Sequence, residues 1–204
     1  MAWLRWTLTA AFLAVAGYCV VRLVVANRVP AEYRGAHRAV DMAHVLMALG
    51  MAAMVSPVGG PLPVAGWQTV FLLLTAWFAA TWWHGRRTGT APEPVGWHGS
   101  PLHHVAAGVA MLVMLGAMPH DGAHSAAPWM AAMPAAEAHT VVVLVGWTLA
   151  AYFLVAATVR LVHTGWRRSC PATQVPALLL APRLTSACEV TMALGTVYML
   201  VTML

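Results

Sequence analysis

Long apolar stretches separated by short, more polar connections make up most of this chain. Each stretch has the length of a helix that crosses the hydrocarbon core of a bilayer, about 20 residues for about 30 Å. The first is too long and too rich in tryptophan for a cleaved signal peptide, so we expect it to be retained. The pattern therefore predicts one all-α domain over residues 1–204, a bundle of six transmembrane helices at about 3–26, 38–57, 65–84, 101–119, 139–162 and 185–204.

Composition agrees with a multi-pass membrane protein. Of the 204 residues, 61% are hydrophobic and only 8% are charged, which leaves too little polar surface for a soluble globule. The connections are too short to form a soluble nucleotide-binding domain, so transport driven by this chain alone would be passive or ion-coupled. The net charge of +5 is expected to favour anionic lipid headgroups, because no nucleic-acid-binding motif is present.

Arginine is unevenly distributed among the connections. Ten of the eleven basic residues flank the first, third and fifth connections, which are therefore predicted to be cytoplasmic. The second and fourth connections contain none. Both termini are then predicted to face outward, and only Arg5 departs from this distribution.

Methionine is also segregated. Twelve of the 13 methionines lie on the second, fourth and sixth predicted helices or in the loop after the fourth. Packing alone would spread this gap-filling residue over all the apolar segments. On the second helix, spacings of three and four place ionisable groups and then sulfurs along one face. These residues are His37, Asp41, His44, Met47, Met51 and Met54.

The fourth and sixth predicted helices repeat this order, with the ionisable group near the cytoplasmic end and methionines toward the outside. The residues are His103, His104, Met111, Met114 and Met118 on the fourth helix, and Glu189, Met192, Met199 and Met203 on the sixth. Ionisable groups inside a membrane are costly and usually mark a functional path. If the three helices touch, four such groups at similar depth are expected to form an inner site. They are Asp41, His44, His104 and Glu189.

The outer connection after the fourth helix is the most metal-like segment of the chain. It combines imidazole, which binds copper, zinc and iron, with thioether sulfur, which is soft and suits Cu(I). Its candidate ligands are Met118, His120, Asp121, His124, Met130, Met133 and His139. We expect this loop to capture copper and the methionine rows to carry Cu(I) toward the inner site.

Other functions fit the same residues. A structural or accessory subunit without chemistry of its own would use the methionines for helix packing. A b-type haem protein would use His44 and His104 as axial ligands. An intramembrane zinc hydrolase would add Asp41 and Glu189, although the chain lacks the paired H-x-x-x-H of ceramidase-like enzymes. We favour a copper-binding protein that is not an enzyme. Its expected partners are the lipid bilayer and a copper-carrying or copper-receiving protein or other membrane subunits, and not nucleic acid.

The D-x-x-H motif at 41–44 and the methionines that follow it, the H-H pair at 103–104 and the six-helix length resemble an actinobacterial family of small membrane proteins. That family is described as a domain of unknown function. The resemblance implies a bacterial plasma membrane and supplies no activity. The abundance of alanine and arginine, with no lysine, also suits a bacterium with a high-GC genome.

Overall fold

The six predicted helices are present in the computed structural model, which describes residues 2–26, 36–89, 100–117, 135–166 and 182–203. No strand occurs within these ranges. The helix bounds lie within a few residues of the predicted ones. The helices are α1 (Ala2–Ala26), α2 (Ala36–Val55), α3 (Val64–Thr88), α4 (Pro101–Ala117), α5 (Ala135–Trp166) and α7 (Pro182–Met203).

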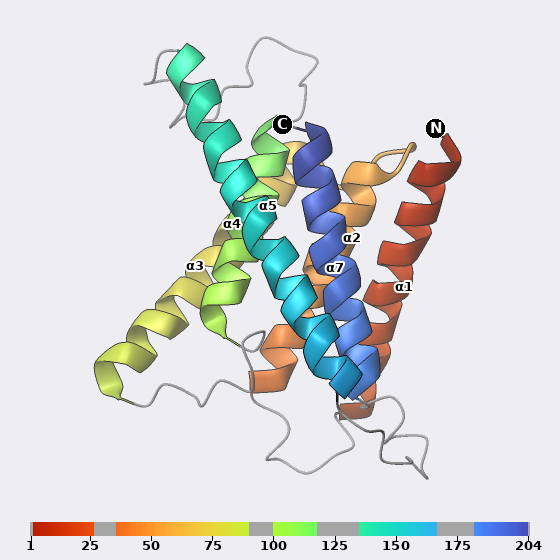
Figure 1. The fold of residues 1–204 in the computed structure, drawn as a ribbon, viewed down its shortest axis with the longest axis vertical. Helices are drawn as coiled ribbons and strands as arrows, with labels where there is room; N and C mark the ends of the chain where they lie inside the picture. The colour runs from red at the N-terminus through yellow and green to blue at the C-terminus, as the bar shows by residue number, and fades with distance from the viewer. Residues whose placement is uncertain (1, 27–35, 90–99, 118–134, 167–181, 204) are drawn as a thin grey trace.

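The helices pack as three antiparallel hairpins. The most extensive contacts join α1 to α2, α3 to α4 and α5 to α7. Figure 1 shows the N- and C-terminal ends of the described chain at the same end of the bundle, as six alternating helices require. The predicted placement of both termini on one side is therefore present, and their outward orientation remains a prediction.

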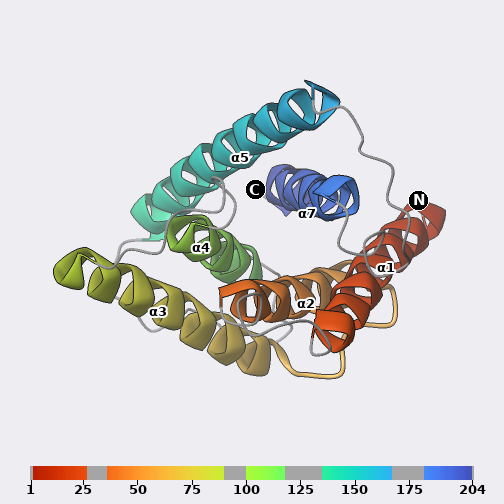
Figure 2. The ribbon, with the colours of Figure 1, turned by 90° about the horizontal axis from the view of Figure 1, so that it is seen from below.

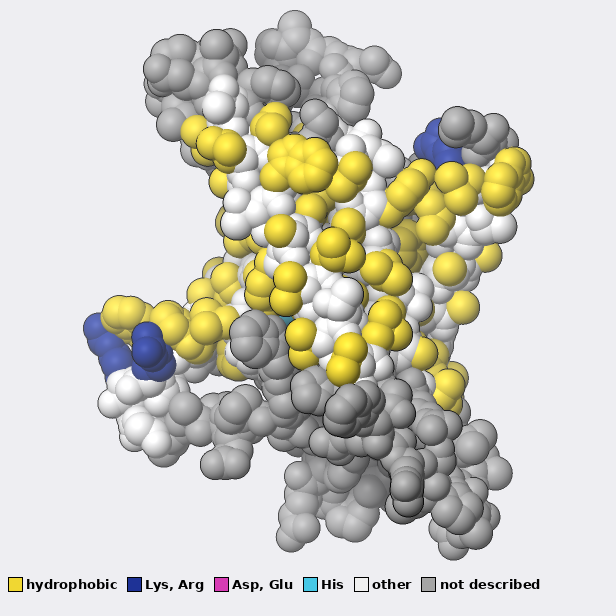
Figure 3. Space-filling view, in the orientation of Figure 1, with side chains coloured by type: hydrophobic (Ala, Val, Ile, Leu, Met, Phe, Trp, Pro, Cys, Tyr) yellow, Lys and Arg dark blue, Asp and Glu magenta, His cyan; other side chains and the backbone are white. Residues whose placement is uncertain are grey.

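The second helix of each hairpin lies toward the centre of the molecule. Helices α2, α4 and α7 all contact one another, and α1, α3 and α5 flank them (Figure 2). Half of the residues in the apolar window of α2 are buried, compared with 17% in that of α3. On the face shown in Figure 3, apolar side chains cover the middle of the molecule and basic side chains occur only toward its ends. The inner helices therefore form the core, and the outer helices present apolar side chains outward.

Five of the described helices are long and apolar enough to cross a membrane. The exception is α4, whose described length of 17 residues lies at the lower limit of about 17–25 residues for a transmembrane helix. A multi-pass membrane protein is therefore indicated, with lipid against its outer helices. The sixth crossing, by α4, remains a prediction.

Glycines allow close approach between neighbouring helices. A Cβ atom at Gly108 of α4 would lie 2.0 Å from Oγ1 of Thr75 on α3. One at Gly195 of α7 would lie 2.5 Å from the ring of Phe12 on α1. Small residues at such points are typical of membrane helices, which associate through close packing rather than through the hydrophobic effect.

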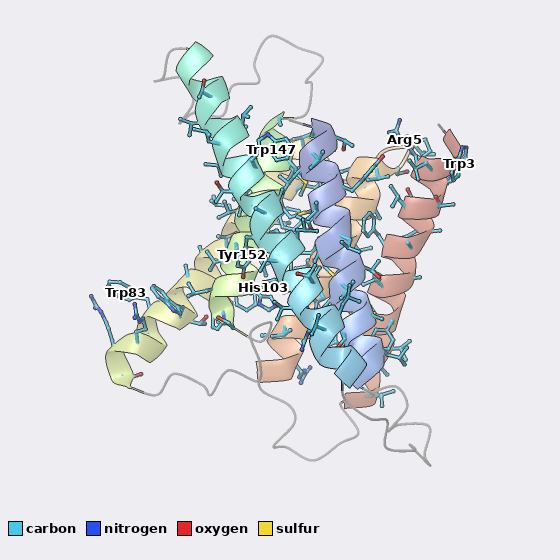
Figure 4. All side chains as sticks on the ribbon, in the orientation of Figure 1. Trp3, Arg5, Trp83, His103, Trp147 and Tyr152 are labelled. Atoms are coloured by element: carbon cyan, nitrogen blue, oxygen red, sulfur yellow. The ribbon has the colours of Figure 1, made fainter. Side chains whose placement is uncertain are left out.

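Arg5, the exception to the arginine distribution, contacts the end of α2. Its Nε donates a hydrogen bond to the carbonyl of Val55 at 3.0 Å, and its Nη2 donates one to the carbonyl of Ser56 at 3.4 Å. Arg5 lies beside Trp3 at the N-terminal end of α1 (Figure 4). The last carbonyls of a helix lack intrahelical partners, and a positive charge there interacts favourably with the helix dipole. The position of Arg5 outside the arginine-rich connections is therefore explained by its contact with the end of α2.

Replacing Arg5 by alanine should lower the free energy of unfolding by about 1 kcal/mol, because the end of α2 loses its donor and its favourable charge. Chemical unfolding in detergent micelles measures this loss. Arg38→Ala is the matched control, because Arg38 is exposed near the opposite end of the same helix. A decrease of equal size in both variants would contradict a specific role for Arg5.

Candidate functional site

A small cavity lies where the three inner helices meet. Its volume is about 20 Å³, which is space for about one water molecule or one ion. Four methionines from three helices contribute to its wall: Met47 and Met51 of α2, Met111 of α4 and Met192 of α7. The hydroxyl of Thr196 on α7 lies 3.7 Å from the sulfur of Met51. The three methionine rows therefore converge on one cavity.

Ionisable side chains complete the wall of this cavity. His44 of α2, His103 of α4 and Glu189 of α7 line it together with the methionines. Each precedes a cavity methionine on its own helix, by three residues in α2 and α7 and by eight in α4. At about 1.5 Å per residue, the ionisable groups lie nearer the ends of the helices that the arginine distribution predicts to be cytoplasmic. The cavity wall therefore has the expected order of ionisable group and then sulfur along each inner helix, and which end faces the cytoplasm remains a prediction.

His104 lies beside the cavity and contacts His44. The two ring centroids are 5.4 Å apart, and His104 also stacks on Phe78 of α3 at 4.6 Å. The side chain is wholly buried, with 0% exposure. Its Nδ1 lies 3.2 Å from the carbonyl oxygen of Ser100, to which a ring N–H donates. Its Nε2 is buried and has no hydrogen-bond partner among the described residues.

His103 faces the opposite hairpin. Its Nδ1 lies 2.9 Å from the hydroxyl of Tyr152 on α5, and both residues are labelled in Figure 4. Its ring also makes an edge contact with Phe153, whose centroid is 5.5 Å away. Phe153 itself lines the cavity, so α5 closes the side that the inner helices leave open.

Asp41, which was expected to group with the histidines, forms an ion pair with Arg22 on α1. Its Oδ2 accepts a hydrogen bond from Nε of Arg22 at 2.9 Å, and its Oδ1 lies 2.7 Å from Nη2. The remaining Nη1 of Arg22 donates to the hydroxyl of Thr185 on α7 at 2.6 Å. Asp41 is only 2% exposed. This paired charge joins three helices, and Asp41 is not among the residues that line the cavity.

Glu189 resembles both the cavity-lining histidines and Asp41, which is bound to an arginine. It lines the cavity and forms an ion pair with Arg160 of α5, whose Nε and Nη2 both approach the same carboxylate oxygen. Two hairpins thus carry an arginine on the outer helix and a carboxylate on the inner one. In the third hairpin, the stack of Phe78 on His104 lies between the helices instead.

The other predicted metal ligands fall into two groups. Met54 and Met114 are buried in the core but do not line the cavity. The outer-loop ligands Met118, His120, Asp121, His124, Met130 and Met133 lie outside the described residues, and so does the side chain of His139 on α5. Over the described part of the chain, no three His, Cys, Asp or Glu side chains are grouped closely enough to hold a metal. Among the described residues, a metal centre with three or more ligands would therefore need methionine sulfur.

Sequence reasoning did not assign Arg22 and Arg160 to the site, because it used them only as markers of the cytoplasmic side. A signal was present, since both lie within apolar stretches and an intramembrane charge usually has a charged partner. His103 and Met192 were recognised as parts of the helical pattern but not proposed as ligands. Adjacent residues such as His103 and His104 point about 100° apart on a helix, and the pattern alone does not determine which one faces a cavity.

Comparison with known proteins identifies a family without assigning an activity. Neither curated proteins nor solved structures gave a match to this chain. Residues 36–203 match the family described as Domain of unknown function (DUF5134). This range runs from the start of α2 to the end of α7 and contains every residue that lines the cavity. Because the match covers well over half of the chain, the protein belongs to this family of unknown function, as the sequence motifs indicated.

Proposed function

We propose that this protein binds Cu(I) in the central cavity and passes it along the methionine rows through the membrane. The observation that carries the proposal is the convergence of four methionines and two histidines on a cavity of about 20 Å³. Thioether sulfur is a soft ligand that suits Cu(I), and imidazole also binds copper. Packing alone explains buried methionines, but it does not explain why ionisable groups share their cavity.

Further buried methionines extend the rows on the side of the cavity away from the histidines. They are Met54 on α2, Met114 on α4 and Met199 on α7. Met54 and Met114 each lie three residues beyond a cavity methionine, or about 4.5 Å along the helix axis. An ion from the outer loop would meet sulfur first and then imidazole and carboxylate. This order supports transfer from outside to inside.

A cation in this cavity also needs a compensating negative charge, because an unpaired charge in an apolar interior is costly. Glu189 is suited to this role, since it lies on the cavity wall. Its partner Arg160 has a side chain that is 25% exposed, whereas that of Arg22 is only 11% exposed. Arg160 lies two residues before the end of the apolar span of α5, so its long side chain can extend to the membrane interface and leave Glu189 to balance the ion. The more deeply buried pair of Arg22 and Asp41 would stay intact.

The same geometry disfavours the alternative cofactors. A cavity of about 20 Å³ has no space for a porphyrin, and the rings of His44 and His104 are already in contact. A hydrolytic zinc site would use Asp41, but this carboxylate is bound to Arg22 and does not line the cavity. A single soft ion fits the cavity better than haem or zinc, and we propose a binding and transfer role rather than an enzymatic one.

The proposal is tested by Cu(I) titration of the detergent-purified protein against a chromophoric Cu(I) chelator. The outer-loop ligands are first replaced, so that only intramembrane binding is measured. Met51→Leu and Met111→Leu should each weaken Cu(I) binding by about 10- to 100-fold or more, because loss of even a supporting group costs this much at metal sites. Leucine keeps the side-chain volume, so the fold should be retained.

Met42→Leu is the matched control for this titration. Met42 lies on the same helix as Met51, but it is 57% exposed on the outer face. Its replacement should leave Cu(I) binding unchanged. If the protein binds no Cu(I), or if Met51→Leu binds as tightly as Met42→Leu, the cavity methionines serve packing and the protein is a membrane subunit without this chemistry.

A further inference from the structure

We infer that His44 and His104 hold a second Cu(I) position, distinct from the thioether position and next to it on the cytoplasmic side. This inference rests on the proposed function and adds a defined step to it. The ion would leave the methionine sulfurs and bind between two imidazoles. The supporting observation is the contact between His44, which lines the cavity, and His104, which is wholly buried.

The unpartnered nitrogen of His104 points to a ligand. A buried polar atom without a hydrogen bond costs about 1–3 kcal/mol, and such an atom in a native structure needs an explanation, for example a bound ion or water or a functional role. Nδ1 of His104 lies against the carbonyl of Ser100, so it carries the ring proton. Nε2 is then the unprotonated nitrogen, whose lone pair can bind a metal ion. This buried atom lacks a hydrogen-bond partner among the described residues.

The surroundings of His104 match those of a metal-binding histidine. Such residues almost always donate the other ring N–H to a carbonyl, a carboxylate or a water, which fixes the tautomer and the ring orientation. Ser100 provides the carbonyl. The ring of Phe78 stacks on His104 at 4.6 Å and restricts its rotation. The histidine is thus held in one orientation with its basic nitrogen available.

The geometry of the pair suits one ion that accepts two nitrogen ligands. Two imidazoles joined by one ion, with metal–nitrogen bonds of about 2 Å, have ring centroids roughly 6 Å apart. The observed separation of His44 and His104 is 5.4 Å, with the rings tilted by 39°. Zn²⁺ takes four ligands in structural sites, whereas Cu(I) is stable with two. The pair therefore favours Cu(I) over zinc.

The position of His44 connects the two sites. It lines the cavity and lies one helical turn from Met47, which also lines it. An ion can therefore exchange sulfur ligands for imidazole nitrogen without crossing an apolar gap. His103 is directed instead toward Tyr152, so the second position uses His104 rather than its neighbour.

The test counts intramembrane Cu(I) equivalents in the full-length protein with the outer-loop ligands replaced, by titration with Cu(I) and by X-ray absorption. We expect two equivalents, the first with copper–sulfur scattering and the second with nitrogen neighbours. His104→Gln should lose the second equivalent and keep the first, and Met51→Leu should weaken only the first. His84→Gln is the control, because His84 is exposed on α3, and it should keep both equivalents.

If His104→Gln does not fold, His44→Gln provides the same test and should also lose the nitrogen-bound equivalent. Two equivalents retained in a folded His104→Gln protein would overturn the inference, and a water would then occupy the position beside Nε2. A single equivalent that is lost in both the Met51 and the His104 variants would also overturn it, because one shared site would explain the data. In either case Cu(I) binding in the cavity, the proposed function, would stand. Absence of any bound Cu(I) would overturn both.

Discussion

Replacing Arg22 by methionine should destabilise the protein by about 3–5 kcal/mol, which is the usual cost of removing one partner of a buried ion pair. Asp41 is 2% exposed and would lose the arginine that balances its charge. Thr185 would lose its hydrogen bond from Arg22 at the same time. Because this one side chain joins α1, α2 and α7, its loss should also loosen the contact between two hairpins.

A double variant separates the unpaired charge from the loss of packing. Replacing both partners of a buried pair by apolar residues of similar volume is often neutral or stabilising. Arg22→Met with Asp41→Leu should therefore recover most of the stability that Arg22→Met alone loses. Chemical unfolding in detergent micelles measures the stability of Arg22→Met, Asp41→Leu, the double variant and the unaltered protein, which together form a double-mutant cycle. A double variant that is no more stable than the single one would show that the arginine acts through packing and not through charge.

The same reasoning ranks the two ion pairs described above. The side chains of Arg160 and Glu189 are 25% and 9% exposed, compared with 11% and 3% for Arg22 and Asp41, so the protein encloses the pair of Arg160 and Glu189 less completely. Breaking that pair should cost less stability than breaking the pair of Arg22 and Asp41. The less costly pair is the one whose carboxylate lines the cavity, which agrees with its proposed role as a counterion for a bound ion.

The helices and their order could be predicted because membrane helices follow from length and hydropathy alone. The methionine row on each helix was also predictable, since spacings of three and four place residues such as Met47 and Met51 on one face. Whether the three rows meet could not be predicted, because this depends on how the helices pack. The predicted ends of the helices were less accurate than their order. The longest helix, α5, has 32 residues and extends four residues beyond the predicted stretch at each end, because a helix need not end where its apolar run ends.

The partners of the buried charges could not be predicted from spacing. A helical pattern shows that Asp41 shares a face with His44, but it does not show what lies opposite. Arginines near helix ends usually mark the cytoplasmic side, and their long side chains often extend toward the interface. Arg22 instead turns inward to Asp41. The direction of the Arg22 side chain depends on how α1 packs against α2, and the pattern along one helix does not contain this information.

Replacing Gly50 by alanine should lower both stability and Cu(I) affinity. A Cβ atom at this position of α2 would lie 2.5 Å from Cζ of Phe71 and 3.0 Å from the terminal methyl of Met111. Phe71 is 0% exposed, so its ring has little room to move. Overpacking of this kind costs about 1–3 kcal/mol, which outweighs the helix propensity of about 1 kcal/mol gained by replacing glycine with alanine. The flexible end of Met111 would shift, and this methionine lines the cavity.

Gly17→Ala is the matched control, because a Cβ at Gly17 of α1 meets nothing within 4 Å. It should be neutral or slightly stabilising, with unchanged Cu(I) binding. Unfolding in micelles and Cu(I) titration on the same samples separate two roles of the contact at Gly50. A loss of stability without a loss of affinity would mean that Met111 fills space without binding the ion. Loss of both, with Gly17→Ala unaffected, would mean that the close approach of α2, α3 and α4 also sets the position of the cavity sulfurs.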